Sequence, residues 1–209
     1  MRILQDSGPY ASMSRFYLSL KRAFDIGLAT IGLVAFLPIS VMFVLVVKLE
    51  DKGPFFYIQE RWGKGGRKFK AYKFRTMVDG ADQKWGLKPA EENDGRVTNV
   101  GKFLRATAMD ELPQLINIWK GDMSFVGPRA LAVGGLDPNH PQFVGRHQVR
   151  PGLTGSAQIY LPRDAALEEK FRYDLDYIKH HTFFGDLKLM LLSIWVTVRG
   201  KWESREKKI

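Results

Sequence analysis

The stretch of sequence that decides the fold is IGLATIGLVAFLPISVMFVLVV, residues 26–47. It carries no charge, and its polar interruptions are Thr30 and Ser40. A helix of this length reaches across the ~30 Å hydrocarbon core of a bilayer. Because helices of globular cores are seldom apolar on every side for so long, we expect a membrane anchor, with a buried core helix as the alternative. A cleaved signal peptide is disfavoured, since no small-residue cleavage site follows the run.

Two features bear on how this anchor sits in the membrane. Pro38 lies near the middle of the run, where it removes a backbone hydrogen bond and bends a helix. Lys21 and Arg22 flank one end, and Lys48 and Lys52 flank the other, so the positive-inside rule gives no strong orientation. We predict a re-entrant helix, which dips into one leaflet and returns at Pro38, so that both basic ends face the cytoplasm. A straight span is the alternative.

The anchor divides the chain into two predicted parts. Residues 1–52 are expected to form a loose or interfacial arm and the anchoring helix, and residues 53–209 a cytoplasmic domain. Asp25 stands three residues after Arg22 at the mouth of the apolar run. An ion pair between them would neutralise a charge at the lipid boundary, although a solvated helix end is a simpler interpretation.

The second part is predicted to be mainly helical and poor in β-structure, with one short β-hairpin. Strand-like residues 55–59 and 68–75 flank a glycine-rich turn at residues 63–66. Helices are expected at residues 101–109, 112–119, 165–180 and 183–198, with a loop or short helix at 79–95 and an irregular, proline-marked stretch from 128 to 151. Residues 183–198 are apolar and precede a basic tail, which fits an interfacial amphipathic helix and a core helix equally well.

Composition limits the classes of function. The 209 residues include 32 Lys and Arg against 22 Asp and Glu, a formal net charge of +10, so the surface favours polyanions. Cysteine is absent, which excludes disulfides, thiolate catalysis, zinc fingers and iron–sulfur ligation. The sequence contains neither a P-loop nor a dinucleotide-binding glycine pattern.

Adjacent carboxylates at Asp110 and Glu111 are the most informative ionisable pair. Because proline is tolerated in the first turn of a helix, Pro113 predicts that Asp110 lies at or next to an N-cap. A helix end favours the ionised carboxylate and attracts phosphate. With basic groups nearby, the pair would suit Mg²⁺ and a diphosphate, although an ordinary helix start explains the spacing better on its own.

Basic residues near turns and strand ends are the candidates for phosphate contact. Gly127-Pro128-Arg129 and the Arg150–Gly155 turn are rigid segments that can offer guanidinium and N–H groups to phosphate, although incidental arginine in a structural turn is commoner. The basic and aromatic alternation of residues 69–75 fits a nucleic-acid surface less well than a solvated strand. The candidates for phosphate or nucleotide binding are Lys73, Arg75, Arg105, Arg129, Arg150 and Thr154.

An ordered set of short segments extends these observations. The segments are KRAFD (21–25), GPFF (53–56) with Gln59 and Arg61, YKFRTM (72–77), RVT (96–98) with Gly101, Leu104 and Arg105, DELPQL (110–115) with Asn117, GDMS (121–124), VGPR (126–129) and PGLTG (151–155). In this order they resemble the bacterial sugar transferases, also called monotopic phosphoglycosyl transferases, from about residue 19 to residue 198. No single segment is decisive, but the set is specific.

The resemblance implies an activity and a location. A sugar phosphate would pass from a UDP-sugar to polyprenol (undecaprenyl) phosphate, with Mg²⁺, at the cytoplasmic face of the bacterial inner membrane, in glycoconjugate or polysaccharide biosynthesis. Asp110 would be the nucleophile and would also contact the metal, forming an acyl phosphate as UMP leaves. Glu111 would support metal, geometry or proton handling. The family anchor is a re-entrant helix bent at a proline, in agreement with Pro38, and residues 53–209 would be the catalytic domain.

One departure from the family pattern lies beside the expected site. The family usually has Pro-Arg-Pro, whereas this chain has Pro128-Arg129-Ala130, so phosphate contact by Arg129 stays an expectation but the loop would be less rigid. The chain resembles the minimal form of the family. Expected partners are the UDP-sugar, polyprenol phosphate and phospholipid, with a homo-oligomer allowed and no nucleic acid. The alternative is a membrane-tethered basic module that binds nucleic acid or anionic lipid, with Asp110 and Glu111 as a helix cap.

Overall fold

The computed structural model of the chain describes residues 15–86, 94–134, 141–202, 204–206 and 208–209, and the expected arm at residues 1–14 lies outside them. The elements are α1 (Arg15–Asp51), β1 (Phe56–Trp62), η1 (Lys64–Gly66), β2 (Lys68–Phe74), α2 (Ala81–Trp85), α3 (Asn99–Ala106), η2 (Met109–Glu111), α4 (Gln114–Lys120), β3 (Ser124–Val126), α5 (Pro141–Arg146), β4 (Gly152–Thr154), α6 (Ser156–Tyr160), α7 (Leu167–His180) and α8 (Phe183–Val198). The predicted mainly helical, β-poor fold is confirmed.

The predicted hairpin is confirmed in position and in turn. Strands β1 and β2 pair antiparallel, from Phe56 opposite Phe74 to Trp62 opposite Lys68. Gly65 and Gly66 have φ angles of 67° and 70° in the connecting turn, a left-handed conformation that favours glycine. A second sheet, in which the three-residue strands β3 and β4 pair in parallel, is not predicted, because strands this short show no period-two pattern.

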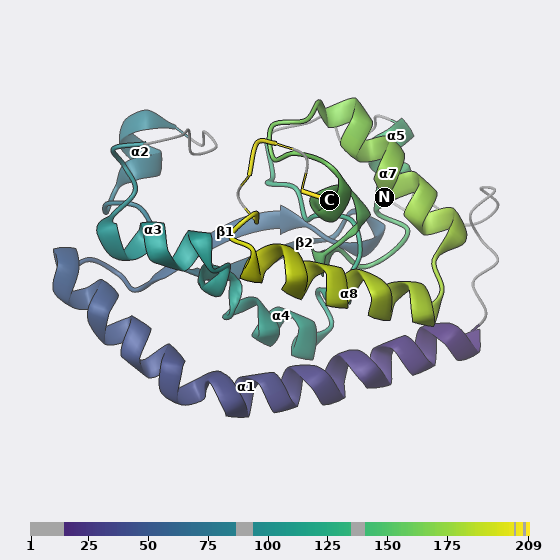
Figure 1. The fold of residues 1–209 in the computed structure, drawn as a ribbon, viewed down its shortest axis with the longest axis horizontal. Helices are drawn as coiled ribbons and strands as arrows, with labels where there is room; N and C mark the ends of the chain where they lie inside the picture. Colours follow the sequence, from purple (N-terminus) through teal and green to yellow (C-terminus); the bar gives the residue numbers. More distant parts are fainter. Residues whose placement is uncertain (1–14, 87–93, 135–140, 203, 207) are drawn as a thin grey trace.

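Helix α1 runs beneath the rest of the molecule as one long element (Figure 1). Figure 1 shows it bent in its middle, and Pro38 lies inside the helix. Before Pro38, Ala29 packs with Leu115 and Ile118 of α4. After Pro38, the helix packs against the hairpin and α3 through a second cluster made up of Phe43, Val47, Phe74 and Leu104. Both halves of α1 therefore contact the same body of the protein.

The chain between α3 and α4 departs from the predicted helix start. Ala108 has a φ of 55°, in the left-handed region, and it turns the chain out of α3 into the separate 3₁₀ turn η2. Helix α4 starts four residues after Asp110, with Pro113 as its N-cap residue. The prediction that Asp110 lies at or next to an N-cap is wrong, because the acids occupy their own turn. The predicted end of α4 at Gly121, whose φ is 96°, is confirmed.

The remaining core lies under α6, α7 and α8. Its buried members are Val126, Ile159, Tyr177, Ile178 and Leu189. Figure 1 shows α8 passing over α1 at the lower side of the molecule, with the hairpin behind the loops that lead to the C-terminus. The 3₁₀ turn η2 packs against α3 and against strand β2 of the hairpin.

Close backbone approach beside this turn generates a stability prediction. A Cβ atom on Gly101 of α3 would lie 2.1 Å from the carbonyl oxygen of Thr76. Backbone cannot yield as a flexible side chain does, so Gly101→Ala should lower the free energy of unfolding by about 2 kcal/mol or more. Gly95→Ala is the matched control, because its Cβ would meet nothing within 4 Å. Thermal unfolding in detergent measures both, and equal stabilities would contradict the packing described.

Candidate active site

Two adjacent acids are buried in the turn η2. Asp110 and Glu111 expose only 8% and 5% of their surfaces. Burying an ionised carboxylate costs free energy unless cations or hydrogen-bond donors compensate it. The surroundings of each acid therefore decide which form it takes.

Glu111 receives most of the compensation. Its Oε1 atom accepts hydrogen bonds from Lys73 Nζ of β2 and from Arg129 Nη2, the latter at 2.9 Å. Asp110 has a longer ion pair, with 3.5 Å between its Oδ2 atom and Lys73 Nζ. Among the described residues, Lys73 and Arg129 therefore contact Glu111 more closely than Lys73 contacts Asp110.

This asymmetry drives the pKa values of the two acids apart. Burial raises the pKa of Asp110, and the charge of Glu111 raises it further, against the lowering effect of Lys73 and Arg105. Burial also acts to raise the pKa of Glu111, but Lys73 and Arg129 outweigh it and hold that pKa below its usual range. Neighbouring acids with divergent pKa values are typical of catalytic pairs with separate roles.

Three further arginines of the described residues lie near the pair. Arg61 of β1 interacts electrostatically with both acids, and burial together with the repulsion of Arg129 lowers its pKa to about 10. Arg105 at the end of α3 and Arg163 in the loop before α7 also interact with Asp110. Arginines gathered in this way suit the binding of anions that carry several charges.

The loop that carries Arg129 is held by two other arginines. Arg146 Nη2 donates to the carbonyl oxygen of Arg129 at 2.9 Å, and Arg61 Nη1 donates to that of Ala130 at 3.1 Å. Arg146 is itself fixed by Asp174 of α7, with 2.7 Å between Nη2 and Oδ2. These contacts hold the loop at Arg129 and Ala130, although Ala130 replaces the second proline of the Pro-Arg-Pro pattern. The Arg129 side chain remains 42% exposed, so its guanidinium can contact both Glu111 and a ligand.

Comparison with known proteins assigns the site to a family. The model of the bacterial sugar transferase family matches residues 16–200. The chain belongs to this family. It is 38% identical, over 90% of its length, to the UDP-N-acetylgalactosamine-undecaprenyl-phosphate N-acetylgalactosaminephosphotransferase of Aeromonas hydrophila, and it spans 45% of that protein.

Two further relatives are matched over more of their own length. The chain is 39% identical to the UDP-glucose:undecaprenyl-phosphate glucose-1-phosphate transferase of Caulobacter vibrioides, over 83% of the chain and 68% of that protein. It is 41% identical to the uncharacterized sugar transferase EpsL of Bacillus subtilis, over 84% of the chain and 85% of that protein. The sugar transferase region thus accounts for nearly all the described elements.

Three of the residues predicted for phosphate contact lie elsewhere in this sugar transferase. Arg75 forms an ion pair with Asp79, 3.5 Å between Nη1 and Oδ1, and packs against Gly53. Arg150 Nε donates to the carbonyl oxygen of Gly121 at the end of α4, at 2.8 Å. Thr154 is buried in β4. The structure brings Lys73, Arg105 and Arg129 to the acids and gives these three residues other neighbours.

The anchor residues do not pair as predicted. Asp25 accepts from Ser124 Oγ and from the backbone N–H of Phe125, both at 3.1 Å. Arg22 donates instead to the carbonyl oxygens of Ile118 and Trp119, at 2.6 and 2.7 Å. The last carbonyl oxygens of a helix have no partner within it and carry partial negative charge, so the end of α4 can bind the guanidinium of Arg22. The predicted i,i+3 pair gives way to contacts that fasten α1 to the transferase domain.

Sequence reasoning left two site arginines unassigned. Arg61 lies opposite Phe69 in the hairpin. Alternate residues of a strand share a face, so Arg61 lies on the same face of the hairpin as Lys73. The alternation of the two strands could therefore have identified Arg61 as a neighbour of the site. Arg163 comes to the acids from a loop about fifty residues away. No local pattern marks such a residue, because only the tertiary fold sets its place.

A metal ion at this site would need ligands from a substrate in addition to those of the protein. Within the described part of the chain, no three His, Asp or Glu side chains gather into a metal cage. Mg²⁺ is often held by one or two carboxylates together with phosphate oxygens and water. Because Lys73 and Arg129 already occupy Glu111, Asp110 is the carboxylate suited to such an ion.

The charge around Asp110 predicts a pH effect. Arg105 favours the ionised form of Asp110 and lowers its pKa, so Arg105→Gln should raise that pKa. At a given acid pH a smaller fraction of Asp110 is then ionised, and the acid limb of the pH profile of transferase kcat/KM should move to higher pH by about half a unit to one unit. Arg172→Gln, an exposed arginine on α7, is the control. An unmoved limb, or one moved to lower pH, would contradict this coupling.

Proposed function

We propose that this protein transfers a sugar 1-phosphate from a UDP-sugar to polyprenol phosphate, in bacteria undecaprenyl phosphate, through a covalent intermediate on Asp110. The observation that carries the proposal is the unequal environment of the two acids among the described residues: Lys73 and Arg129 both contact Glu111, and Asp110 has a longer ion pair with Lys73. The names of the Aeromonas and Caulobacter relatives include a UDP-sugar and undecaprenyl phosphate. The reaction would be the first membrane step of glycoconjugate or polysaccharide biosynthesis.

The proposed chemistry divides one displacement into two. An oxygen of the Asp110 carboxylate attacks the sugar-side phosphorus of the donor, the bond from that phosphorus to the UMP oxygen breaks, and UMP leaves with the electron pair. Oxygen of the polyprenol phosphate then attacks the same phosphorus and releases the Asp110 carboxylate. Arg129, Arg105 and Arg163 would neutralise charge on the phosphate oxygens in both steps.

The neighbouring groups prepare Asp110 for this role. Lys73 contacts both acids, so it would orient Asp110 while keeping Glu111 ionised. An ionised Glu111 cannot donate a proton to Asp110, and its charge raises the reactivity of the adjacent carboxylate by repulsion. Mg²⁺, held by Asp110 and donor phosphate oxygens, would supply further positive charge at the diphosphate.

The surface of α1 supports a place in the membrane. The apolar window within residues Phe16–Glu50 is only 11% buried within the protein. Its exposed side chains include Ile31, Val34, Leu37, Val41 and Leu45, and α8 adds others on its outer face, among them Phe184, Leu191 and Ile194. An apolar surface this large is stable in contact with lipid rather than with water.

The contacts of α1 favour the re-entrant form over a straight span. Near its start, Lys21 forms an ion pair with Asp186 of α8. Near its end, Glu50 Oε1 accepts from the backbone N–H of Asn99 at 2.8 Å, capping α3. A straight span would carry one of these ends across the bilayer, away from the domain that it contacts. We therefore propose that α1 enters and leaves one leaflet, with the transferase domain on the cytoplasmic face.

The nucleophile is tested by Asp110→Asn. An amide does not form the acyl phosphate, so UMP release from UDP-sugar should fall by about a thousandfold or more, while the thermal unfolding temperature changes little or rises as the buried charge is removed. Asp176→Asn, an exposed carboxylate on α7, is the control and should keep full activity. Near-normal UMP release from Asp110→Asn would reject the covalent role.

The topology is tested by cysteine labelling. Because the chain contains no cysteine, Ser19→Cys and Lys52→Cys each create a single thiol at one end of α1. With a re-entrant helix, a membrane-impermeant maleimide should label both positions in inside-out vesicles and neither in intact spheroplasts. Labelling of one position from the outer side would establish a straight span.

A further inference from the structure

The segment after α8 folds back to the catalytic site. We call residues 201–209 the tail; the structure describes all of it except positions 203 and 207. The tail lies beyond residue 200, where the match to the family ends. Figure 1 shows it turning away from the end of α8 and returning over the middle of the molecule, where the C-terminus lies. The tail therefore lies over the body of the protein rather than extending away from it.

Specific contacts hold the tail in this place. The backbone N–H of Arg163 donates to the carbonyl oxygen of Ser204 at 3.0 Å. Lys208 Nζ donates to the carbonyl oxygens of Gln158 and Trp202, at 2.9 and 2.8 Å, and Lys208 exposes only 5% of its surface. Ile209 packs against the core cluster under α6, α7 and α8. The tail is thus docked by a buried lysine and an apolar contact.

Docking of the tail brings Lys208 near other cations of the site. Burial, together with repulsion by Arg129 and Arg163, lowers the pKa of Lys208 to about 8. Arg163 interacts electrostatically with Arg105, Arg129 and Arg205, as well as with Asp110. Like charges gathered at short range oppose folding. A phosphate group bound among these cations would weaken their mutual repulsion.

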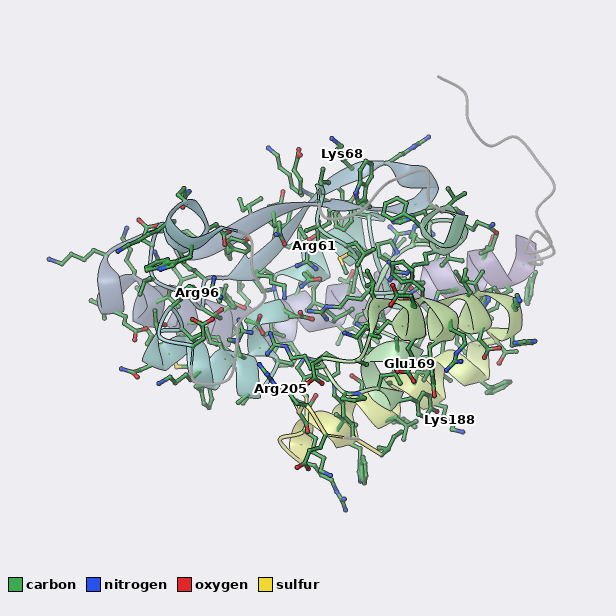
Figure 2. All side chains as sticks on the ribbon, turned by 90° about the horizontal axis from the view of Figure 1, so that it is seen from above. Arg61, Lys68, Arg96, Glu169, Lys188 and Arg205 are labelled. Carbon is green, nitrogen blue, oxygen red and sulfur yellow. The ribbon has the colours of Figure 1, made fainter. Side chains whose placement is uncertain are left out.

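Arg205 is the member of this group that is best placed for a ligand from solution. It is exposed, and it sits on the tail next to Arg163, whose backbone holds Ser204. Figure 2 shows Arg205 on the yellow C-terminal segment, apart from Arg61 of the hairpin. The arginines 105, 129, 163 and 205 thus extend the positive charge from Asp110 outward to the tail.

We propose that the tail forms a wall of the transferase site, in which Arg205 contacts a phosphate group of a substrate while Lys208 fixes the tail in place. The inference rests on the proposed function for the identity of its ligands. The donor contributes two phosphates and the acceptor one, so the shared chemistry is a phosphate group. Arg205 is a binding residue in this account and takes no part in the displacement at Asp110.

The test compares Arg205→Ala with Arg172→Ala, which removes another exposed arginine, on α7. Calorimetry on the detergent-solubilised full chain measures binding of UDP in the presence of Mg²⁺. If the phosphate is the donor's, Arg205→Ala should weaken UDP binding about three- to fivefold, the size of one exposed charge-assisted contact, and Arg172→Ala should not. Arg205→Lys keeps the charge and should restore most of the affinity.

Steady-state kinetics separates the two sources of phosphate. If Arg205 contacts the acceptor instead, UDP binding stays unchanged and the KM for undecaprenyl phosphate rises by a similar factor. Unchanged UDP binding together with unchanged KM values for both substrates would overturn the proposal. A fall of several degrees in the unfolding temperature of Arg205→Ala would also overturn it, because removing a repelled arginine should leave the fold as stable or make it more stable.

The same variants distinguish this proposal from the proposed function. A wild-type protein that binds UDP through Arg205 but releases no UMP from any UDP-sugar would retain the tail site and refute the transferase mechanism. A wild-type protein that releases UMP, with Arg205→Ala identical to it in binding and kinetics, would retain the mechanism and refute the tail site.

Discussion

The unequal sharing of cations between Asp110 and Glu111 is the interaction on which the site depends. Two adjacent acids in a buried turn repel each other, and the fold resolves the conflict by placing Lys73 and Arg129 on Glu111. These cations come from β2 and from the loop after β3, so the same ion pairs also join separate parts of the domain. Removing one partner would leave a charge buried without compensation, which costs more than the pair itself contributes. Asp110 keeps the longer contact, while its neighbour stays ionised and is held by two cations.

The membrane helix and the site form one structural unit. Phe74, the residue after Lys73, packs against the second half of α1, and Leu104, next to Arg105, joins the same cluster. The start of α1 is fastened to α4 and α8 by Arg22 and Lys21. Any change in the bend of α1 would therefore be transmitted to the residues that surround the acids. This arrangement suits an enzyme that must hold the reacting group of a lipid and of a water-soluble nucleotide at one carboxylate.

Sequence alone predicts the elements that have a strong periodic or compositional signal. The hairpin and the helix at residues 183–198 belong to this class and occur close to their predicted bounds, and the apolar run at residues 26–47 lies within the longer helix α1. The turn η2 has no such signal in the sequence, because it depends on the left-handed backbone conformation of Ala108, which alanine rarely adopts.

The neighbours of Asp110 also include residues that the sequence indicates and residues that it does not. The family pattern points to Lys73, whereas Arg163 reaches the site through tertiary folding and Arg150 is captured by a helix end.

The central claim is that Asp110 carries the sugar phosphate during the reaction, and mass spectrometry of the protein trapped between its two steps tests it most directly. The protein is mixed with UDP-sugar and Mg²⁺ in the absence of polyprenol phosphate, quenched in acid and digested. The account predicts an added mass equal to one sugar phosphate on the peptide that contains Asp110, and its loss when polyprenol phosphate is added before quenching. An adduct on another residue, or UMP release that proceeds only when polyprenol phosphate is present and leaves no adduct, would contradict the account.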